Sequence, residues 1–371
     1  MVDLHGQYLK IKKEVDNAIQ EVIDSTAFIR GDDVRQFQIE LSDYMGVKHC
    51  ITCGNGTDAL QVSLMALDLQ PGDEVITTPF TFIATVEVIR LLGLKPVFVD
   101  VLPDTFNLDP TLLEQALSDR TRAIVPVHLF GQCADMKSIL EFAQINGLFV
   151  IEDNAQALGA DFLPDGGSTQ KAGTLGHLGT TSFFPSKNLG AFGDGGAIFT
   201  NDESFGLRVA SLVNHGMGRR YHYDHVGVNS RLDTLQAAIL RVKLKHLDDY
   251  HQRRQEAAAW YDATLSDLPG VKVPRRSSFS THIFHQYTLQ VPPSKRDALR
   301  QYLQDKGIPS MIYYPGPLHL QKAYRDLGLK EGDLPVSEEL CSRVLSLPMH
   351  TELGKDQLEY ISEQLRLYFK N

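Results

Sequence analysis

Residues 148–156 read LFVIEDNAQ, in which an unbroken apolar run is followed by two acids, Glu152 and Asp153. A run of this kind, apolar on both faces, is typical of a strand buried inside a parallel sheet. Similar short runs recur along the first two thirds of the chain and alternate with longer stretches of helical period. This alternation predicts βαβ units and a largely parallel sheet.

The apolar runs and the periodic stretches between them give expected bounds for these elements. We expect strands at residues 50–53, 74–78, 96–101, 123–128, 148–153, 179–184 and 196–200. We expect helices at residues 57–67, 82–92, 109–117 and 136–146. In an open parallel sheet, ligands bind beyond the carboxyl ends of the strands. The residues that follow each strand are therefore the candidates for chemistry.

The pattern changes after about Leu244. The remaining sequence predicts a smaller α+β unit, with helices at 248–265, 294–306 and 355–368 and a strand near 284–291. We expect a large domain at residues 1–247, which includes an N-terminal arm, and a small C-terminal domain at residues 248–371.

The charge balance argues against a function in binding nucleic acid. The 371 residues include 46 Asp and Glu against 36 Lys and Arg, which gives a formal net charge of -10. This charge repels phosphate backbones.

Four cysteines are too few for a disulfide framework in so long a chain, which favours a reducing compartment. We find neither a signal-peptide pattern nor a membrane-spanning apolar run, so we expect a soluble cytoplasmic protein.

Cys50 and Cys53 have the C-x-x-C spacing that many zinc ligands share. The sequence offers no second pair of Cys or His at a distance that would complete four ligands. We therefore expect two small hydrophobic side chains on a buried strand, and no metal site.

Three segments that follow expected strands carry residues with chemical uses. GNGTDAL at residues 54–60 places two glycines at a helix N-terminus, whose N–H groups are suited to phosphate. Asp153 ends the strand quoted above, and SFFPSKNLG at residues 182–190 presents Lys187 in a turn. Each segment alone also has a structural explanation, as an N-capped turn, a capping acid and a surface ammonium.

Together, and in this order, the three segments resemble the DegT/DnrJ/EryC1/StrS family of sugar aminotransferases. The resemblance covers nearly the whole chain and includes PGDEVITTPFTFIAT (71–85), TRAIVPVHLFGQCADM (121–136) and GVNSRLDTLQAAIL (227–240). It implies the α/β fold of PLP-dependent transferases of fold type I, which is like that of aspartate aminotransferase. That fold has a large, mixed, mostly parallel sheet domain and a smaller C-terminal α+β domain. Within the family, the chain is similar to the UDP-2-acetamido-2-deoxy-3-oxoglucuronate aminotransferase group.

The resemblance implies that the cofactor is pyridoxal 5'-phosphate and that Lys187 and Asp153 are catalytic. Lys187 would form a Schiff base with the cofactor aldehyde, which requires a neutral amine, and would later move a proton as general base and acid. Some relatives have histidine in place of this lysine and act as dehydratases, so Lys187 favours transamination. Asp153 would face the pyridine nitrogen and keep the ring protonated.

Further cofactor contacts follow from the same resemblance. Gln156 matches a residue that contacts the phenolic oxygen of the cofactor, and Phe82 matches one whose ring stacks on the pyridine. A core phenylalanine is the alternative for Phe82. The phosphate would be bound by Gly56, Thr57, Asp58, Ser182 and, across a subunit boundary, Asn229. The last contact implies a homodimer with shared active sites.

The site for the amino acceptor is expected in a basic and aromatic set of residues. Arg219 and Arg220 could bind a diphosphate or a sugar acid, because the planar guanidinium suits oxyanions, although a solvated loop is the alternative. Arg231 and Tyr314 match contacts to the nucleotide sugar in the glucuronate group. Tyr313 stands where that group has histidine, and tyrosine offers no cation, which puts a carboxylate-bearing sugar in doubt.

The implied reaction moves an amino group from L-glutamate to a keto sugar, a UDP- or dTDP-linked 3-keto or 4-keto hexose, in a ping-pong cycle. Products of this kind enter O-antigen, other surface glycans or amino-sugar metabolites. Two alternatives stay open, namely another PLP reaction of fold type I, such as aldol cleavage or elimination, and a PLP-binding regulator. We assign no role to His128, His215 and His319.

Overall fold

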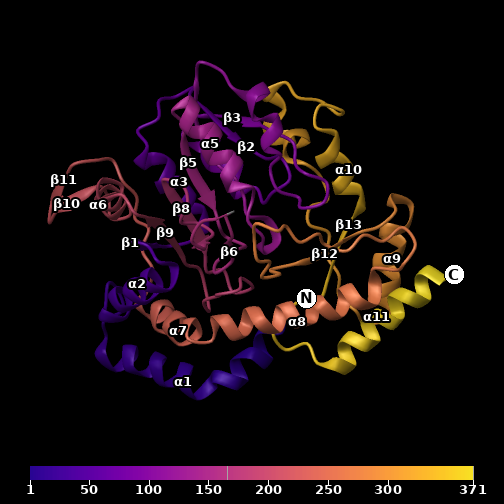
Figure 1. Cartoon of the computed structure of the whole chain (residues 1–371). Coiled ribbons are helices and arrows are strands. Elements are labelled where there is room, and N and C mark those ends of the chain that lie inside the picture. Colours follow the sequence, from indigo (N-terminus) through magenta and orange to yellow (C-terminus); the bar gives the residue numbers. More distant parts are fainter. Residues whose placement is uncertain (165, 371) are drawn as a thin grey trace.

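The protein, seen here as a computed structural model, is described over residues 1–164 and 166–370. Within this part of the chain a seven-stranded sheet forms the centre (Figure 1), and β9 alone runs against the other strands. The expected mixed, mostly parallel sheet is thereby confirmed. In spatial order the strands are β1 (His49–Cys53), β9 (Gly196–Thr200), β8 (Leu178–Ser182), β5 (Phe149–Asp153), β4 (Thr121–Ile124), β2 (Glu74–Thr77) and β3 (Lys95–Phe98).

Helices cover both faces of this sheet because its strands are apolar on both sides. Ile51, Ile151 and Ile198 point to one face and pack with α3, α4 and α6. On the opposite face, Val150 packs with α5, and Phe199 packs with α2 and α7. The covering helices are α2 (Asp32–Met45), α3 (Gly56–Ala66), α4 (Ala84–Leu91), the 3-10 helix η1 (Pro110–Ala116), α5 (Met136–Asn146), α6 (Glu203–Leu212) and α7 (Thr234–Leu244).

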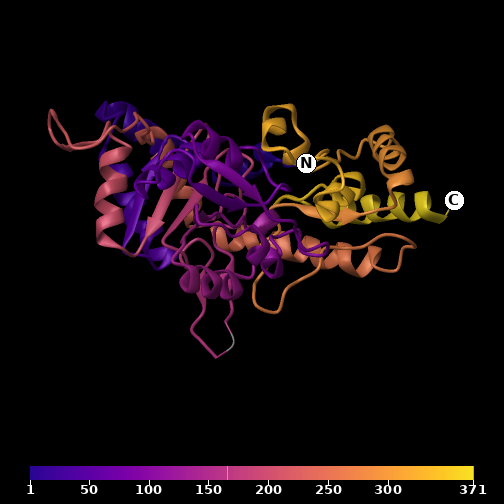
Figure 2. The same ribbon diagram turned by 90° about the horizontal axis from the view of Figure 1, so that it is seen from above.

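Several smaller elements lie around the sheet. The N-terminal helix α1 (Leu4–Ser25) packs on α7 through Ile11, Val15, Ile239 and Val242. A hairpin of β10 (Met217–Arg219) and β11 (His222–Tyr223) projects away from the sheet beside α6 (Figures 1 and 2). The remaining short elements are the 3-10 helix η2 (Leu129–Gly131) and the pair β6 (Asp161–Phe162) and β7 (Gln170–Lys171).

After α7, a second, smaller core of helices and two strands forms beside the main sheet. The long helix α8 leads into it (Figure 1), and an antiparallel pair of strands packs with α8, α9 and α11 around Tyr261, Leu289 and Leu365. The domain division after residue 247 stays a prediction. The elements are α8 (Leu247–Leu265), β12 (Tyr287–Gln290), α9 (Pro293–Asp305), η3 (Leu318–Leu320), η4 (Lys322–Leu327), α10 (Pro335–Arg343), β13 (Val344–Leu347) and α11 (Lys355–Lys370).

Two expectations about individual segments have clear outcomes. Cys50 and Cys53 are buried in β1, as two small hydrophobic side chains would be. The helix expected at residues 109–117 is the short 3-10 helix η1, which stops where Leu117 takes an extended backbone. Across the described residues, we find no helix with the length and apolar content to span a bilayer.

A carboxylate from the large sheet joins the two units. Asp100 follows β3, is 5% exposed, and accepts hydrogen bonds from the Val336 and Ser337 N–H groups, both at 2.9 Å. These N–H groups lie in the first turn of α10, where helix geometry provides no acceptors. Asp100 is therefore the N-terminal cap of a helix in the other unit, and its charge suits that helix end.

We predict that Asp100→Ala lowers the free energy of unfolding by about 2 kcal/mol, because the first turn of α10 loses its acceptor. Equilibrium unfolding in urea measures this loss. The control is Asp109→Ala, since Asp109 caps η1 near the surface and accepts from the Thr111 N–H at 2.9 Å. We expect less than about 1 kcal/mol for that control. Equal losses in the two variants would contradict the special role of Asp100.

Candidate active site

Segments that follow β1 and β8 meet at the carboxyl-end edge of the sheet. Gly56, at the start of α3, packs directly on Ser182, and a Cβ added to Gly56 would lie 2.6 Å from the Ser182 Cβ. Only glycine permits this approach. The segment marked for phosphate binding, residues 54–60, is therefore in contact with the segment that carries Lys187, residues 182–190.

The N-terminus of α3 forms the expected cradle, with one difference from the prediction. Asn55 caps the helix, because its Oδ1 accepts the Asp58 N–H at 2.8 Å. That N–H, predicted to bind phosphate, is thus engaged by the cap, and helix geometry leaves the Gly56 and Thr57 N–H groups without an acceptor inside α3. Ser230 closes the cradle, accepting from the Gly54 N–H at 2.8 Å and donating to Asp58 Oδ2 at 2.6 Å.

Lys187 lies in a tight turn directly after β8. Its N–H donates to the Phe184 carbonyl at 2.8 Å, and Gly190 packs so closely that an added Cβ would lie 2.3 Å from the Pro185 carbonyl oxygen. Burial lowers the pKa of Lys187 to about 8, and the negative charge of Asp153 acts against that shift. About a tenth of this amine is therefore neutral at pH 7, against far less than a hundredth for an ordinary lysine, and the neutral amine is the form that attacks a carbonyl carbon.

A buried lysine on α7 supports the turn that carries Lys187. Lys243 on α7 is 2% exposed, its Nζ donates to the Gly190 carbonyl at 2.5 Å, and it lies 5.7 Å from the centroid of the Phe192 ring. Burial lowers the pKa of Lys243 to about 8, and the nearby Arg254 charge adds to this shift. The turn that carries Lys187 is thus fixed to α7.

Asp153 ends β5 and is 5% exposed. Its Oδ2 accepts from the Thr85 hydroxyl at 2.8 Å, and its Oδ1 accepts from the Ala155 N–H at 3.2 Å. The Asp153 N–H donates to the Pro126 carbonyl at 2.9 Å, and the Asp153 carbonyl accepts from the His128 N–H at 3.0 Å. Both the main chain and the carboxylate of Asp153 are therefore held in place.

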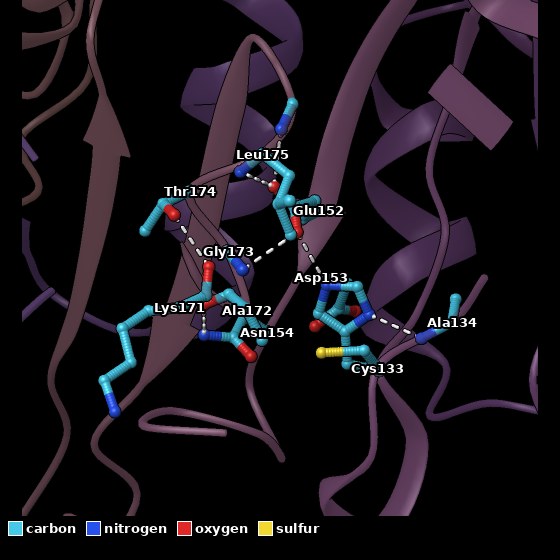
Figure 3. A network of polar contacts seen from close by, with 12 residues as sticks. Cys133, Ala134, Glu152, Asp153, Asn154, Lys171, Ala172, Gly173, Thr174 and Leu175 are labelled. Atoms are coloured by element: carbon cyan, nitrogen blue, oxygen red, sulfur yellow. Dashed lines mark hydrogen bonds and ion pairs between the residues drawn. The ribbon is translucent and has the colours of Figure 1, made fainter. Parts of the chain in front are cut away.

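The neighbouring acid, Glu152, points to the other side of the strand and is fully buried (Figure 3). One of its oxygens accepts from the Leu175 and Gly176 N–H groups at 2.7 and 2.6 Å, and the other accepts from Gly173 N–H and His128 Nε2, both at 2.8 Å. His128 Nδ1 accepts from the Ala134 N–H at 3.1 Å, so Nε2 carries the proton. This set of bonds satisfies a buried charge and fixes the strand end that presents Asp153.

Gln156 connects two segments that are far apart in sequence. Its Oε1 accepts from the Phe130 N–H at 2.8 Å, and its Nε2 donates to the Tyr314 hydroxyl at 3.2 Å. Burial raises the pKa of both Tyr313 and Tyr314, which keeps their hydroxyl groups protonated. Phe82 precedes α4 and its ring is 56% exposed, so it is available for stacking and is not a core residue.

The fold of one chain does not bring every predicted residue to Lys187. Arg219 and Arg220 are exposed on the projecting β10–β11 hairpin, where the Arg220 guanidinium lies 5.2 Å from the Tyr221 ring centroid. Asn229 is also exposed and pairs through its backbone with Asn214. Arg231 is half-buried beside a cavity of about 290 Å³. The roles of these residues stay predictions.

The structure places further residues at the site that sequence reasoning missed. Thr85 holds Asp153, and the His128 pair with Glu152 lies behind it. His285 Nδ1 lies 3.3 Å from Asn188 Oδ1, and burial, then the charges of Lys187 and Arg254, hold the pKa of His285 well below its usual range. The available signal for His128 is its place at the end of the strand expected at 123–128, and for Thr85 its place in the PGDEVITTPFTFIAT segment, whereas His285 had no such signal. His215 is exposed, and His319 pairs with Glu338 at 3.1 Å, outside this constellation.

Comparison with known proteins identifies the family. Residues 9–366 match the DegT/DnrJ/EryC1/StrS aminotransferase family, and the chain belongs to it. It is 46% identical to a protein named "Pleiotropic regulatory protein" from Geobacillus stearothermophilus (100% of this chain, 98% of that one). It is 44% identical to UDP-2-acetamido-2-deoxy-3-oxo-D-glucuronate aminotransferase from Pseudomonas aeruginosa (98% of each chain). A solved aminotransferase of the family from Brucella abortus is 42% identical and superposes with a TM-score of 0.94 (100% of this chain, 99% of that one).

The protein is accordingly a PLP-dependent aminotransferase. A related structure, NtdA from Bacillus subtilis, was solved with bound PMP (32% identity, TM-score 0.90, covering 98% of this chain and 82% of that one). The residues described above fit such a cofactor, because a half-buried amine of lowered pKa, a held carboxylate, an exposed phenylalanine and a helix N-terminus lie on segments that follow the sheet at one edge. When bound, the cofactor supplies an aldehyde and a cationic ring that accepts electrons.

We predict that the apo-protein captures pyridoxal phosphate with a pH midpoint near 8, not near the 10.5 of an ordinary lysine. The sign follows from burial, which favours the neutral amine at lower pH. Borohydride trapping at short times across a pH series, read by mass spectrometry, measures it. Asp153→Asn should move the midpoint lower, because the carboxylate favours the ammonium form. A midpoint near 10 in the unmodified protein would contradict the burial of Lys187.

Proposed function

We propose that the enzyme transfers an amino group from L-glutamate to a keto group on a nucleotide-diphosphate-linked hexose. The observation that carries the proposal is the half-buried Lys187, whose amine has its pKa lowered to about 8 by desolvation and interacts electrostatically with Asp153. The family supports an aminotransferase, and the Pseudomonas aeruginosa relative is named for a UDP-linked keto sugar. Nucleotide, ring position and stereochemistry stay outside the proposal.

In the donor stage, each residue at the sheet edge has a separate task. Lys187 would hold the cofactor through its aldehyde and, once an amino donor takes its place, would carry a proton as base and then as acid. Asp153 holds a proton on the ring nitrogen. Gly56, Thr57 and Ser182 bind the phosphate group, and Phe82 provides an apolar face for the ring.

In the acceptor stage, arginines bind the diphosphate of the sugar nucleotide. Arg219 and Arg220 present planar guanidinium groups on a hairpin that extends beyond the body of its own chain (Figure 2), and Arg231 lies near the cradle. Tyr314 provides a hydroxyl group bonded to Gln156, and Tyr313 precedes it in the chain. Tyr313 offers no positive charge, which counts against a carboxylate-bearing sugar at that position.

We further propose that the enzyme works as a homodimer in the cytoplasm. Asn229 and the β10–β11 hairpin support the dimer, because both are exposed on their own chain. If Asn229 binds the cofactor phosphate and the hairpin binds the acceptor, as expected, they would do so in the site of a partner chain. A symmetric pair is also the commonest oligomer. Support for the location comes from the four buried, unpaired cysteines, which are typical of a reducing compartment.

Replacement of Lys187 tests the proposed function. We predict that Lys187→Ala stops the glutamate-dependent conversion of the cofactor, lowering its rate by at least about 1,000-fold, because the proton carrier is lost. The measurement is the formation of 2-oxoglutarate from glutamate. The same assay is then run with a panel of UDP- and dTDP-linked 3-keto and 4-keto hexoses, and amino-sugar product is detected by mass spectrometry.

The control is Lys245→Ala, because Lys245 is an exposed lysine on the same molecule and should keep full activity. A cofactor label trapped on another lysine would show that Lys187 is the wrong residue. Amination of no keto sugar by a protein that does consume glutamate would contradict the proposed acceptor class.

Mixing two inactive variants tests the shared site. If Asn229 reaches across a subunit boundary, co-refolded Asn229→Ala and Lys187→Ala chains should recover part of the activity, since one of the two sites in a mixed dimer is intact. We expect up to about one quarter of the normal activity from statistical pairing of equal amounts. Activity no higher than that of the separate variants would count against a shared site.

A regulatory function is the second candidate, because the Geobacillus stearothermophilus relative carries a regulatory name. The net charge of -10 opposes direct binding to DNA. Retarded migration of DNA in a gel, dependent on the cofactor, would favour the regulator. Release of aldehyde or ammonia without stoichiometric 2-oxoglutarate would instead favour aldol cleavage or elimination.

A further inference from the structure

Among the described residues, Thr85 is the one whose side chain donates a hydrogen bond to the Asp153 carboxylate. Thr85 and Asp153 lie on different elements. Thr85 lies in the first turn of α4, is 1% exposed, and its hydroxyl is 2.8 Å from Asp153 Oδ2. Phe82, whose exposed ring belongs to the proposed cofactor site, accepts the Thr85 N–H through its carbonyl at 3.4 Å. A single turn of chain therefore presents the aromatic ring and also reaches the carboxylate.

The direction of the hydrogen bonds around Thr85 follows from the number of protons. An ionised carboxylate only accepts, so Thr85 must give its single hydroxyl proton to Asp153. The Thr81 hydroxyl is 3.2 Å from the Thr85 hydroxyl and is 2% exposed, so it is the donor in that pair. The two hydroxyls form a one-way chain from Thr81 through Thr85 to Asp153.

These hydrogen bonds matter because an aspartate carboxylate rotates easily. The final torsion of an aspartate side chain has a broad and shallow preference. Two donors on different oxygens remove that freedom, namely Thr85 on Oδ2 and the Ala155 N–H on Oδ1. They come from different elements, α4 and the turn after β5, so the carboxylate plane is defined by the packing of the fold.

We propose that Thr85 is a positioning residue for transamination, whose hydroxyl holds the Asp153 carboxylate in the plane from which it meets the ring nitrogen of the cofactor. The inference rests on the proposed roles of Lys187 and Asp153. Thr85 touches neither glutamate nor the acceptor sugar. Its loss therefore affects the rate of the chemical step and the electronic state of the cofactor, and leaves substrate affinity unchanged.

The test compares Thr85→Val, which keeps the shape and removes the donor, with Thr85→Ser, which keeps the donor. We expect Thr85→Val to slow the glutamate half-reaction at saturating glutamate by about 10- to 100-fold, the usual effect of losing a partner that orients a catalytic group. The KM for glutamate should change by less than about twofold, and the visible absorption spectrum of the holoenzyme should change. Thr85→Ser should restore both the rate and the spectrum.

The matched control is Thr77→Val. Thr77 is a fully buried threonine on β2, and its hydroxyl donates to the Val125 carbonyl at 2.9 Å. Its replacement removes a buried hydrogen bond of the same kind, so it should lower the urea midpoint as Thr85→Val does and leave rate and spectrum unchanged. Thr81→Val is a milder second variant, and about a threefold loss of rate is expected because Thr85 keeps its bond to Asp153.

The outcomes separate this inference from the proposed function. If the unmodified protein neither binds the cofactor nor consumes glutamate, the proposed function fails, and the role of Thr85 fails with it. If the unmodified protein is active and Thr85→Val has the same rate and spectrum, the role of Thr85 alone is overturned. Equal rate losses in Thr77→Val and Thr85→Val, or no recovery in Thr85→Ser, also overturn it. If Thr85→Val does not fold, an unchanged rate and spectrum in Thr81→Val decide against the inference.

Discussion

The removal of one lysine from water is the constraint on which the rest of the site depends. An ammonium group loses hydration when it is buried, so the neutral amine becomes the favoured form, and the Asp153 charge limits how far this goes. The surrounding fold must hold the amine in that place against its preference for solvent. The tight turn at Gly190 and its bond to Lys243 provide this restraint.

Much of the fold could be predicted because local signals agreed with the tertiary structure. The helix expected at residues 136–146 has those bounds, since Asp135 caps its start and Gly147 takes a left-handed conformation at its end. The helix expected at 82–92 begins only at Ala84, and Phe82, which precedes it, keeps an exposed side chain. No periodicity revealed that β9 runs antiparallel, since the direction of a strand is set by its pairing.

The candidate site was less predictable than the fold. Lys187, Asp153 and the cradle follow strands, so topology alone places them at one edge. The contact of Gln156 with Tyr314 spans two units and leaves no trace in local sequence. Glu152 was given no role from the sequence, yet its oxygens accept backbone N–H groups from a loop that only the folded chain brings near (Figure 3). Such partners are set by three-dimensional packing.

The hydrogen bonds of Asp100 restrict the motion of the smaller unit relative to the main sheet. Several contacts tie the smaller unit to the main sheet. They are the bond from α10 to Asp100, the Leu318 N–H bond to the Pro79 carbonyl at 2.9 Å, and the Gln290 amide bond to the Pro103 carbonyl at 2.6 Å. A rigid hinge motion would break all of these bonds together. These bonds therefore oppose any large change in the spacing of the two units.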